Sequence, residues 1–540
     1  MKMNIKLLSA CAVAISLAGA CIEEADITAT LSETKREELA KTNPDKIFNA
    51  SLTGMYQDMQ QYVKTDLSHN YFGQKSFDYL TSLMGNDMVM TNRYAMSIYH
   101  YILDYWGENY TPTANRWSEY YNTITNANKI LKTATKDSED ETLLYYRAVA
   151  LGFRGYAYLQ LTYLYQYPYY MGVEGTKWGK GKVYDYSKEP CVPLITEETE
   201  GDQPLSSLDA VYGRLIEDLE ESYAIFKALG CEKTDLATDF DGCVVATYLA
   251  RAYMVKHDWD NAIKYAQVVI DNFDCLDTED QILQGFSDIT LKDVVFGCDI
   301  TADNSTIYAS WFSQMDSYSD GYAGIGVWRV AFRPLVDRIA DDDVRLKWFC
   351  CERSTGVESE GNTYILLRDT KYEAPAEYLS VKFIGAGRSA IVNSGGDGTG
   401  WEVGDYIYLR SEEAWFVKAE ALAHKGESGE AIKVLEDVMK TRQPSYSYTF
   451  TDKASLIEEI NFQKRVEFWG EGIEYLDNRR LNIPVDRTDK TWGKDNLGND
   501  NSNHFSGAKI YAAQDDRCFL YQIPISEIEN NTKLTDADQN

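Results

Sequence analysis

A repeated helix pair limits most strongly what this chain of 540 residues can fold into. The first copy covers residues 243–271, and the second begins at residue 411. In each copy, an apolar stripe on one helix precedes an alanine on the next by the same interval, in the pairs Ala246–Ala262 and Trp415–Ala431. These residue classes match tetratricopeptide repeats, where small residues let two helices cross closely. The repetition predicts a mainly α-helical, tetratricopeptide-like helix-pair scaffold.

Long segments without helical periodicity separate the predicted helices. Helical spacing of apolar residues also covers 117–131, 143–161 and 212–226. The irregular segments, which contain glycine and aromatic residues, lie at about 162–207, 272–330, 350–408 and 482–520. Connections of this length are uncommon in compact chains and are usually functional. We therefore expect long irregular loop insertions that form a broad, shallow binding face.

The N-terminus carries an export pattern. Lys2 and Lys6 precede an apolar run, Leu7 to Leu17, that is too short to span a bilayer, and small residues then lead to Cys21. This pattern resembles a bacterial lipoprotein signal, in which the cysteine is lipidated and becomes the new N-terminus. We predict a signal peptide over 1–20, lipidation at Cys21 and a polar tether over 21–44.

The lipoprotein pattern has one departure and two alternatives. Ala18 stands three places before Cys21, where such signals usually carry leucine. Cys11 fits the motif better, but only about half of the usual 7–15 apolar residues precede it. A cleaved secretory signal with an incidental cysteine is the other alternative. Glu23 and Glu24 resemble the acidic tag that directs lipoproteins of Bacteroidetes-type bacteria to the cell surface.

Charge and the scarcity of histidine exclude several classes of function. A formal net charge of −31 without a basic stripe disfavours binding to nucleic acids or anionic membranes. The sequence has no CxxC and only five histidines, so it predicts no metal site and no cofactor. It also lacks GxSxG and HExxH, and among 84 acidic residues a pair at catalytic spacing arises by chance. We read the run Asp341–Asp343 as solvated charge beside a helix, and we expect no enzyme activity.

Six segments in order are similar to the SusD/RagB family of outer-membrane nutrient-binding lipoproteins, of Bacteroidetes type. These segments are Trp117–Leu131, Tyr146–Leu164, Pro334–Arg345, Tyr406–Ala423, Arg465–Arg480 and Tyr521–Ile528. The resemblance covers nearly all of the mature chain and implies one SusD-like domain over 45–540, with an N-terminal part to about 300 and a C-terminal part from about 301. Glu474 is a departure, since members often carry arginine there; it bears on a helix end.

The resemblance also implies a role. Members are lipid-anchored on the surface of the outer membrane, where they bind oligosaccharides, or in some cases peptides. They deliver the ligand to a SusC-like TonB-dependent transporter without catalysis. Two competing functions stay open, a secreted glycan hydrolase and a tetratricopeptide scaffold that binds only protein.

Aromatic and polar residues gather in the segment Asp303–Trp328. Flat rings cover the apolar face of a sugar, while amides and carboxylates bind its hydroxyl groups. The predicted ligand residues of this segment are Tyr308, Trp311, Phe312, Gln314, Asp316, Tyr318, Tyr322 and Trp328. Trp311 is the preferred stacking platform because it lies between two other rings. The alternative is that Trp311 and Trp328 anchor the loop to the core.

A second candidate segment is Gly85–Tyr94. In relatives, the segment that precedes the WSEYY-type helix lines the ligand face. We predict ligand contacts from Asp87, Asn92, Arg93 and Tyr94. The alternative is a helix-capping turn that begins at Asn86 or Asp87.

Overall fold

A computed structural model describes most of the chain after residue 43. The described residues are 44–60, 71–90, 97–104, 106–301, 309–317, 319, 321–324, 326–355, 364–365, 373–374, 376–385, 404–489 and 508–540. Cys21 and most of the predicted tether lie outside them.

Helices dominate the described residues, and the strands are short. The helices are α3 (Pro44–Gln60), α4 (Gly73–Leu83), α5 (Ile98–Tyr101), α6 (Thr111–Leu131), α7 (Glu141–Tyr165), α8 (Leu208–Ala228), α9 (Gly242–Val255), α10 (Trp259–Asn272), α11 (Glu279–Ile282), α12 (Trp311–Met315), α13 (Arg333–Val336), α14 (Glu352–Thr355), α16 (Glu412–Lys425), α17 (Ser428–Met439), α18 (Lys453–Glu467), α19 (Ile473–Leu481) and α20 (Ile525–Asn530). The strands are β1 (Met88–Met90), β2 (Tyr170–Met171), β3 (Tyr184–Asp185), β4 (Pro190–Pro193), β5 (Leu205–Ser207), β6 (Val294–Cys298), β7 (Arg329–Ala331), β8 (Phe349–Cys350), β9 (Tyr364–Ile365), β10 (Glu373–Ala374), β11 (Leu379–Ser380), β12 (Tyr406–Arg410), β13 (Val485–Asp486) and β14 (Tyr511–Ala512).

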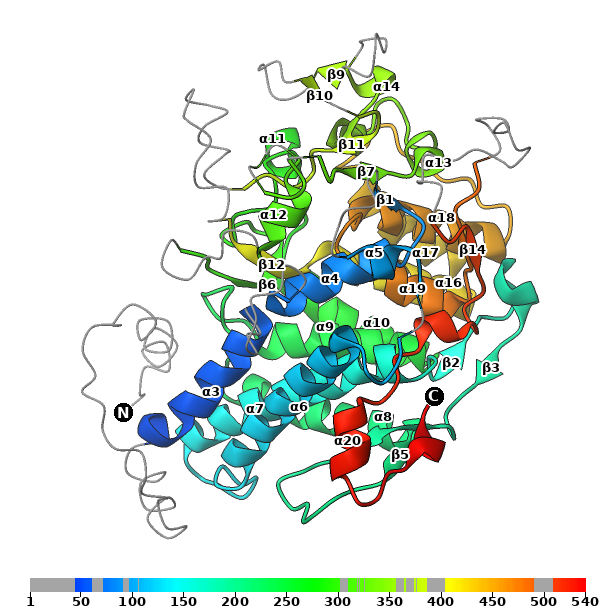
Figure 1. Cartoon of the computed structure of the whole chain (residues 1–540). Helices are drawn as coiled ribbons and strands as arrows, with labels where there is room; N and C mark the ends of the chain where they lie inside the picture. The colour runs from blue at the N-terminus through cyan, green and yellow to red at the C-terminus, as the bar shows by residue number, and fades with distance from the viewer. Residues whose placement is uncertain are drawn as a thin grey trace.

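The predicted helix-pair scaffold is confirmed. Helices α6, α7, α8, α9, α10 and α16 pack successively on one another, and α17 and α18 pack on α16 (Figure 1). The two predicted repeat pairs are α9 with α10 and α16 with α17. The alanines at their predicted crossings, Ala246, Ala250, Ala262 and Ala266, are all buried.

Local sequence signals set the ends of these helices. Asp241 begins α9 by accepting hydrogen bonds from the backbone N–H groups of Cys243 and Val244, and Asp258 caps α10 in the same way. Gly426 ends α16 with a φ of 84°, a left-handed conformation that favours glycine. The helix pairs therefore follow from short-range patterns.

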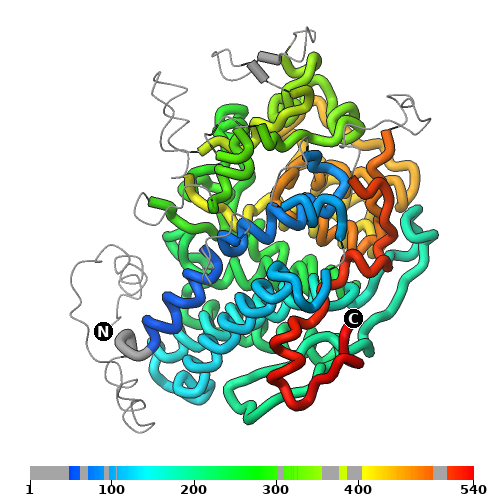
Figure 2. Tube along the Cα trace, in the orientation of Figure 1, coloured from blue at the N-terminus to red at the C-terminus, as the bar shows by residue number. Residues whose placement is uncertain are grey.

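The predicted irregular segments hold most of the short strands. One four-stranded sheet has the order β1-β7-β11-β8, and β6 pairs with β12 in a separate antiparallel ribbon. In Figure 1, β1, β7, β11 and α12 lie in the upper part of the view, α9 and α10 in the middle, and α6, α7 and α8 in the lower part. The trace in Figure 2 shows the C-terminal segment lying against the cyan helices of the N-terminal part.

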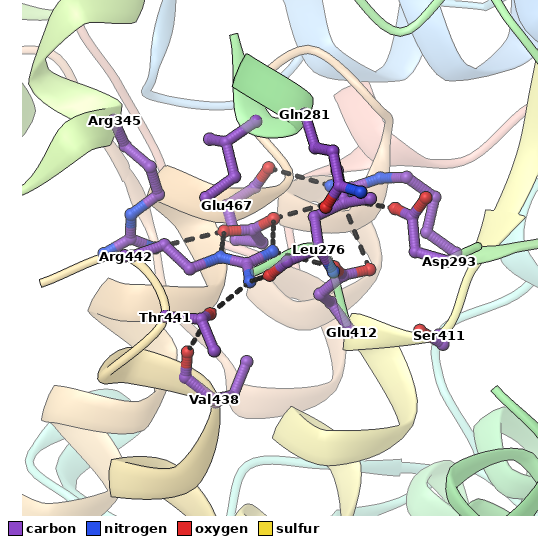
Figure 3. Close-up of polar contacts among 12 residues, drawn as sticks. Leu276, Gln281, Asp293, Arg345, Ser411, Glu412, Val438, Thr441, Arg442 and Glu467 are labelled. Carbon is purple, nitrogen blue, oxygen red and sulfur yellow. Dashed lines mark hydrogen bonds and ion pairs between the residues drawn. The ribbon is translucent and has the colours of Figure 1, made fainter. Parts of the chain in front are cut away.

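A buried ion cluster joins the sheet region to the second helix pair (Figure 3). Its centre is the Glu467 carboxylate at the end of α18, which Arg345, Arg410 and Arg442 all contact. The four cations and five carboxyl groups of the cluster are Arg345, Arg410, Arg442 and Lys382, and Asp293, Asp343, Glu412, Glu467 and Glu471. Burial and the neighbouring Glu412 raise the pKa of Asp293 well above its usual range. A protonated Asp293 leaves four carboxylates for four cations, so the cluster is electrically balanced.

This cluster corrects one prediction. Asp343 is buried, and its carboxylate accepts hydrogen bonds from the Arg345 guanidinium, at 2.7 Å from Nη2 to Oδ2 and 3.1 Å from Nε to Oδ1. Asp341 is solvated as predicted, with a side chain 86% exposed. The run of three aspartates therefore splits between the surface and the interior, because the chain turns inward at Asp343.

The cysteines after Cys21 are free thiols, and most of them are buried. Burial raises the pKa of Cys191 and of Cys350, so these thiols are inert nucleophiles. Among the described helices, none combines the length and apolar character needed to cross a bilayer.

Candidate glycan-binding site

Strand β1, inside one predicted ligand segment, pairs with β7, the strand that directly follows the other segment. β1 pairs with β7 in antiparallel register, with Met88 opposite Ala331, Val89 opposite Val330 and Met90 opposite Arg329. The chain therefore leaves β1 after Met90 at the same end of the sheet where it enters β7. We call this end, with Met90, Tyr322 and Trp328, the sheet-edge site. Asn92, Arg93 and Tyr94 lie outside the described residues.

Trp311 is buried, contrary to its expected role as a stacking platform. Only 1% of the residue is exposed. The Lys75 Nζ lies 3.9 Å from the centre of its ring, and Phe383 packs edge-on at 5.0 Å. Phe312, the next residue in α12, is also fully buried. In this structure neither ring presents a face to solvent, and the surroundings of Trp311 favour the alternative that it anchors the segment.

Gln314 and Asp316, the amide and the carboxylate predicted to bind sugar hydroxyl groups, are also buried. The Gln314 Oε1 accepts a hydrogen bond of 2.8 Å from Arg329 Nη2, and Asp316 Oδ2 accepts one of 3.1 Å from the backbone N–H of Gly385. Both side chains are buried. They hold the segment against β7 and against the irregular chain that follows β11, and so they support the site from the interior.

Tyr322 and Trp328 are the predicted rings of this segment that are described and partly exposed. A tight turn presents Tyr322: a Cβ on Gly324 would meet the carbonyl oxygen of Ser319 at 1.7 Å, so only glycine fits there. The Nε1 of Trp328 has no hydrogen-bond partner among the described residues. Tyr308 and Tyr318 lie outside the described residues.

Asp87, a predicted ligand residue, is buried and supports the sheet. It is 2% exposed, and its carboxylate binds the Arg465 guanidinium with both oxygens, at 2.7 Å from Nε to Oδ2. Its carbonyl accepts hydrogen bonds from Trp469 Nε1 and from the backbone N–H of Phe332, each 2.9 Å long. The helix-capping alternative is wrong, because Met88–Met90 form a strand.

A second buried carboxyl lies directly beneath β1. Glu474 of α19 accepts hydrogen bonds from the backbone N–H groups of Asn86, at 2.6 Å, and Asp87, at 3.2 Å. Burial, and then the nearby Asp87 carboxylate, raise the pKa of Glu474 to about 7. Glu474, which stands where family members often carry arginine, therefore supports the backbone just before β1.

Sequence reasoning missed the residues that hold this site from below. Arg329 donates to the Tyr79 hydroxyl at 2.5 Å as well as to Gln314, and Arg465 and Glu474 hold Asp87 and its neighbours. Apart from Arg329 and Gln314, these partners are hundreds of residues apart in the chain, so no local motif could reveal them. Among the described residues, no group of three or more histidine, cysteine or acidic side chains could hold a metal ion.

Two family models match parts of this chain. A model described as the SusD family matches residues 362–540, and one described as "Starch-binding associating with outer membrane" matches residues 33–254. No curated protein matches the chain.

Solved structures share the fold. A SusD-like carbohydrate binding protein from Bacteroides vulgatus is 21% identical, with a TM-score of 0.70 over 91% of this chain and 96% of that one. A putative sugar binding protein from the same species is 20% identical, with a TM-score of 0.66 over 92% and 98%. Surface glycan-binding protein A from Bacteroides uniformis is 15% identical, with a TM-score of 0.61 over 92% and 99%.

The helical scaffold, with a small sheet built from its insertions, defines a SusD-like protein. The two matched segments extend over most of the chain and agree with this fold. The chain belongs to the SusD/RagB family.

Proposed function

We propose that this protein is a surface lipoprotein that captures an oligosaccharide at the sheet-edge site and delivers it to a SusC-like TonB-dependent transporter. The pairing of β1 with β7 carries the proposal, because it brings one predicted ligand segment beside the strand that directly follows the other. Tyr322 and Trp328 supply ring surfaces, and Asn92, Arg93 and Tyr94, which follow β1 in the sequence, remain predicted ligand residues. The site captures its ligand without catalysis.

The geometry suits weak, reversible capture. Partly exposed rings on an edge offer stacking to a sugar, and each stacked ring adds about 0.5–1.5 kcal/mol beyond buried area, by analogy with aromatic pairs. Buried Arg329 and Gln314 make the support beneath the rings rigid, which lowers the entropy lost on binding. A preorganised, shallow surface of this kind favours release to a partner.

Retention in gels that contain soluble starch, xylan, mannan or mixed-linkage β-glucan tests capture. We expect one of these polysaccharides to retard the protein, and Tyr322→Ala and Trp328→Ala to reduce the retardation. Tyr110→Ala is the matched control, since its ring is 39% exposed at the start of α6. Equal retardation of all four proteins would contradict the site, and a peptide ligand in place of any glycan would favour the alternative within the family.

Delivery to a transporter requires a complex with it. Affinity purification of the full chain from outer membranes in mild detergent, followed by mass spectrometry, should recover a TonB-dependent barrel. Recovery of the chain alone would contradict the delivery step while leaving capture intact.

A further inference from the structure

A cavity of about 380 Å³ lies away from the sheet-edge site, between the two repeat pairs and the β2–β3 hairpin. Pockets for small ligands are typically about 300–1,000 Å³, so its size suits one small ligand unit. We call it the helix-pair cavity. Its lining residues are Tyr170, Val173, Glu174, Val183, His257, Trp259, His424 and Lys453.

Four rings form a continuous row along this cavity. The ring centres of Tyr170 and His257 are 5.1 Å apart, those of His257 and Trp259 4.8 Å, and those of Trp259 and His424 4.3 Å. Tyr170, His257 and Trp259 are partly exposed, while His424 is buried. The row therefore runs from solvent into the protein. His257, Trp259 and His424 stack face to face, with interplanar angles of 20° and 24°, so the cavity is lined by Tyr170 and by the edges of the stacked rings.

The inner end of the row carries an acceptor without a partner. His424 Nε2 lies 3.2 Å from Oε1 of Glu420, and Arg480 holds that carboxylate with two hydrogen bonds of 2.6 Å. Burial lowers the pKa of His424, so the ring is neutral and Nε2 carries its proton toward Glu420. The Nδ1 is then an acceptor, and it has no partner among the described residues. A side chain 1% exposed rarely leaves a polar atom unpaired.

Charged groups flank the rings. Lys453 Nζ donates to the carbonyl of His424 at 2.8 Å, which places an ammonium group at the wall, and Glu174 is exposed beside it. One cation and one anion add no net charge to the cavity. The chain as a whole carries −31, a field that disfavours anionic ligands.

We propose that the helix-pair cavity is a second binding site, which takes a neutral sugar unit of an oligosaccharide. The Tyr170 ring and the edges of His257 and Trp259 cover the apolar face of the sugar, Glu174 accepts from its hydroxyl groups, and Lys453 donates to one. The proposal rests on the proposed function only in its choice of sugars, because the cavity shares no residue with the sheet-edge site. Two sites on one chain hold a long glycan more firmly than either alone.

Fluorine NMR of protein labelled with 5-fluorotryptophan tests this site directly. Trp259→Phe and Trp328→Phe assign one resonance to each site among the 11 tryptophans. The probes are maltoheptaose, xylohexaose, mannohexaose and laminarihexaose. We expect one of these sugars to shift the Trp259 resonance saturably, and Tyr170→Ala to weaken that titration about three- to tenfold, the loss of one stacked ring.

Two controls make the outcome decisive. Tyr184→Ala should leave the titration unchanged, since Tyr184 is an exposed ring of the same hairpin that does not line the cavity. The Trp259 shift should also persist in a Tyr322→Ala, Trp328→Ala double variant. A sugar that shifts Trp328 but not Trp259, or a Trp259 shift lost in the double variant, overturns the second site and leaves the proposed function standing. Failure of every sugar to shift either resonance overturns both.

Discussion

Arg442 binds both oxygens of the Glu467 carboxylate, with Nε at 3.1 Å from Oε2 and Nη2 at 2.9 Å from Oε1. Burial would raise the pKa of Glu467, but Arg442 and Arg410 hold it well below its usual range. The carboxylate is thus charged in the folded interior, and the arginines around it depend on that charge.

Removal of this charge should unfold the protein readily. Glu467→Gln leaves buried guanidinium groups without compensation, which costs about 3–5 kcal/mol of unfolding free energy. The matched control is Glu436→Gln, which breaks the surface pair with Lys440 and should cost at most about 1 kcal/mol. Urea unfolding measures both, and similar losses would contradict a central role for the cluster.

The Glu474 carboxyl should make stability depend on pH. Its folded pKa of about 7 exceeds the unfolded value near 4.3, so the folded state holds a proton that the unfolded state releases between these values. The stability contributed by this group is therefore full below pH 4 and falls as the pH rises toward 7, by about 3 kcal/mol. Unfolding of the wild type and of Glu474→Gln from pH 4.5 to 7.5 checks this, because the difference between them should change with pH. Parallel curves would exclude a raised pKa.

Substitution by alanine of two glycines inside helices should change the stability of the protein in opposite directions. A Cβ on Gly155 of α7 would meet Leu219 Cγ of α8 at 2.5 Å, whereas a Cβ on Gly213 of α8 meets nothing within 4 Å. Gly155→Ala should cost about 1–3 kcal/mol by overpacking the crossing. Gly213→Ala should stabilise the protein by about 0.5–1 kcal/mol, because alanine loses less entropy in a helix. The melting temperatures of the two variants measure this. If both variants shift the melting temperature in the same direction, the close approach of α7 and α8 is contradicted.

Trp311→Ala should reduce stability more than it alters ligand choice. Removal of a fully buried tryptophan costs about 3–5 kcal/mol, and here Lys75 also loses the ring beneath it. Tyr322→Ala, in the same segment but partly exposed, should melt close to the wild type. Circular dichroism melts of the two variants separate these roles. A Trp311→Ala protein with unchanged melting but no glycan retention would restore Trp311 as the stacking platform.

The lipid anchor predicted at Cys21 remains to be tested in cells. A single acyl chain gives only a reversible hold, with a partition constant on the order of 10⁴ M⁻¹, so permanent attachment needs the several chains of a bacterial lipoprotein. Cys21→Ala should release the protein from outer membranes, while Cys11→Ala should not. Fractionation after a high-salt wash measures this, and a Cys21→Ala protein that still sediments would contradict lipidation there.

Much of the scaffold could be predicted because the sequence signals of a helix lie within the helix itself or next to its ends. The interval from Ala246 to Ala262 marks the crossing of α9 and α10, and Asp241 caps α9 from two and three residues away. Both signals depend on neighbours within a few turns of helix. The helix pairs were therefore determined by the sequence alone.

The sheet-edge site depends on contacts between residues that are far apart in the sequence, and no local pattern predicts such contacts. β1 and β7 are three residues each and about 240 residues apart, and only folding sets Met90 opposite Arg329. Trp311 lies in a segment rich in glycine and serine that predicted an exposed loop, yet Lys75 and Phe383 enclose it. Residue type determines whether a ring could bind a sugar. Whether that ring is covered depends on long-range packing, and this is why tertiary structure moved the candidate platform from Trp311 to Tyr322 and Trp328.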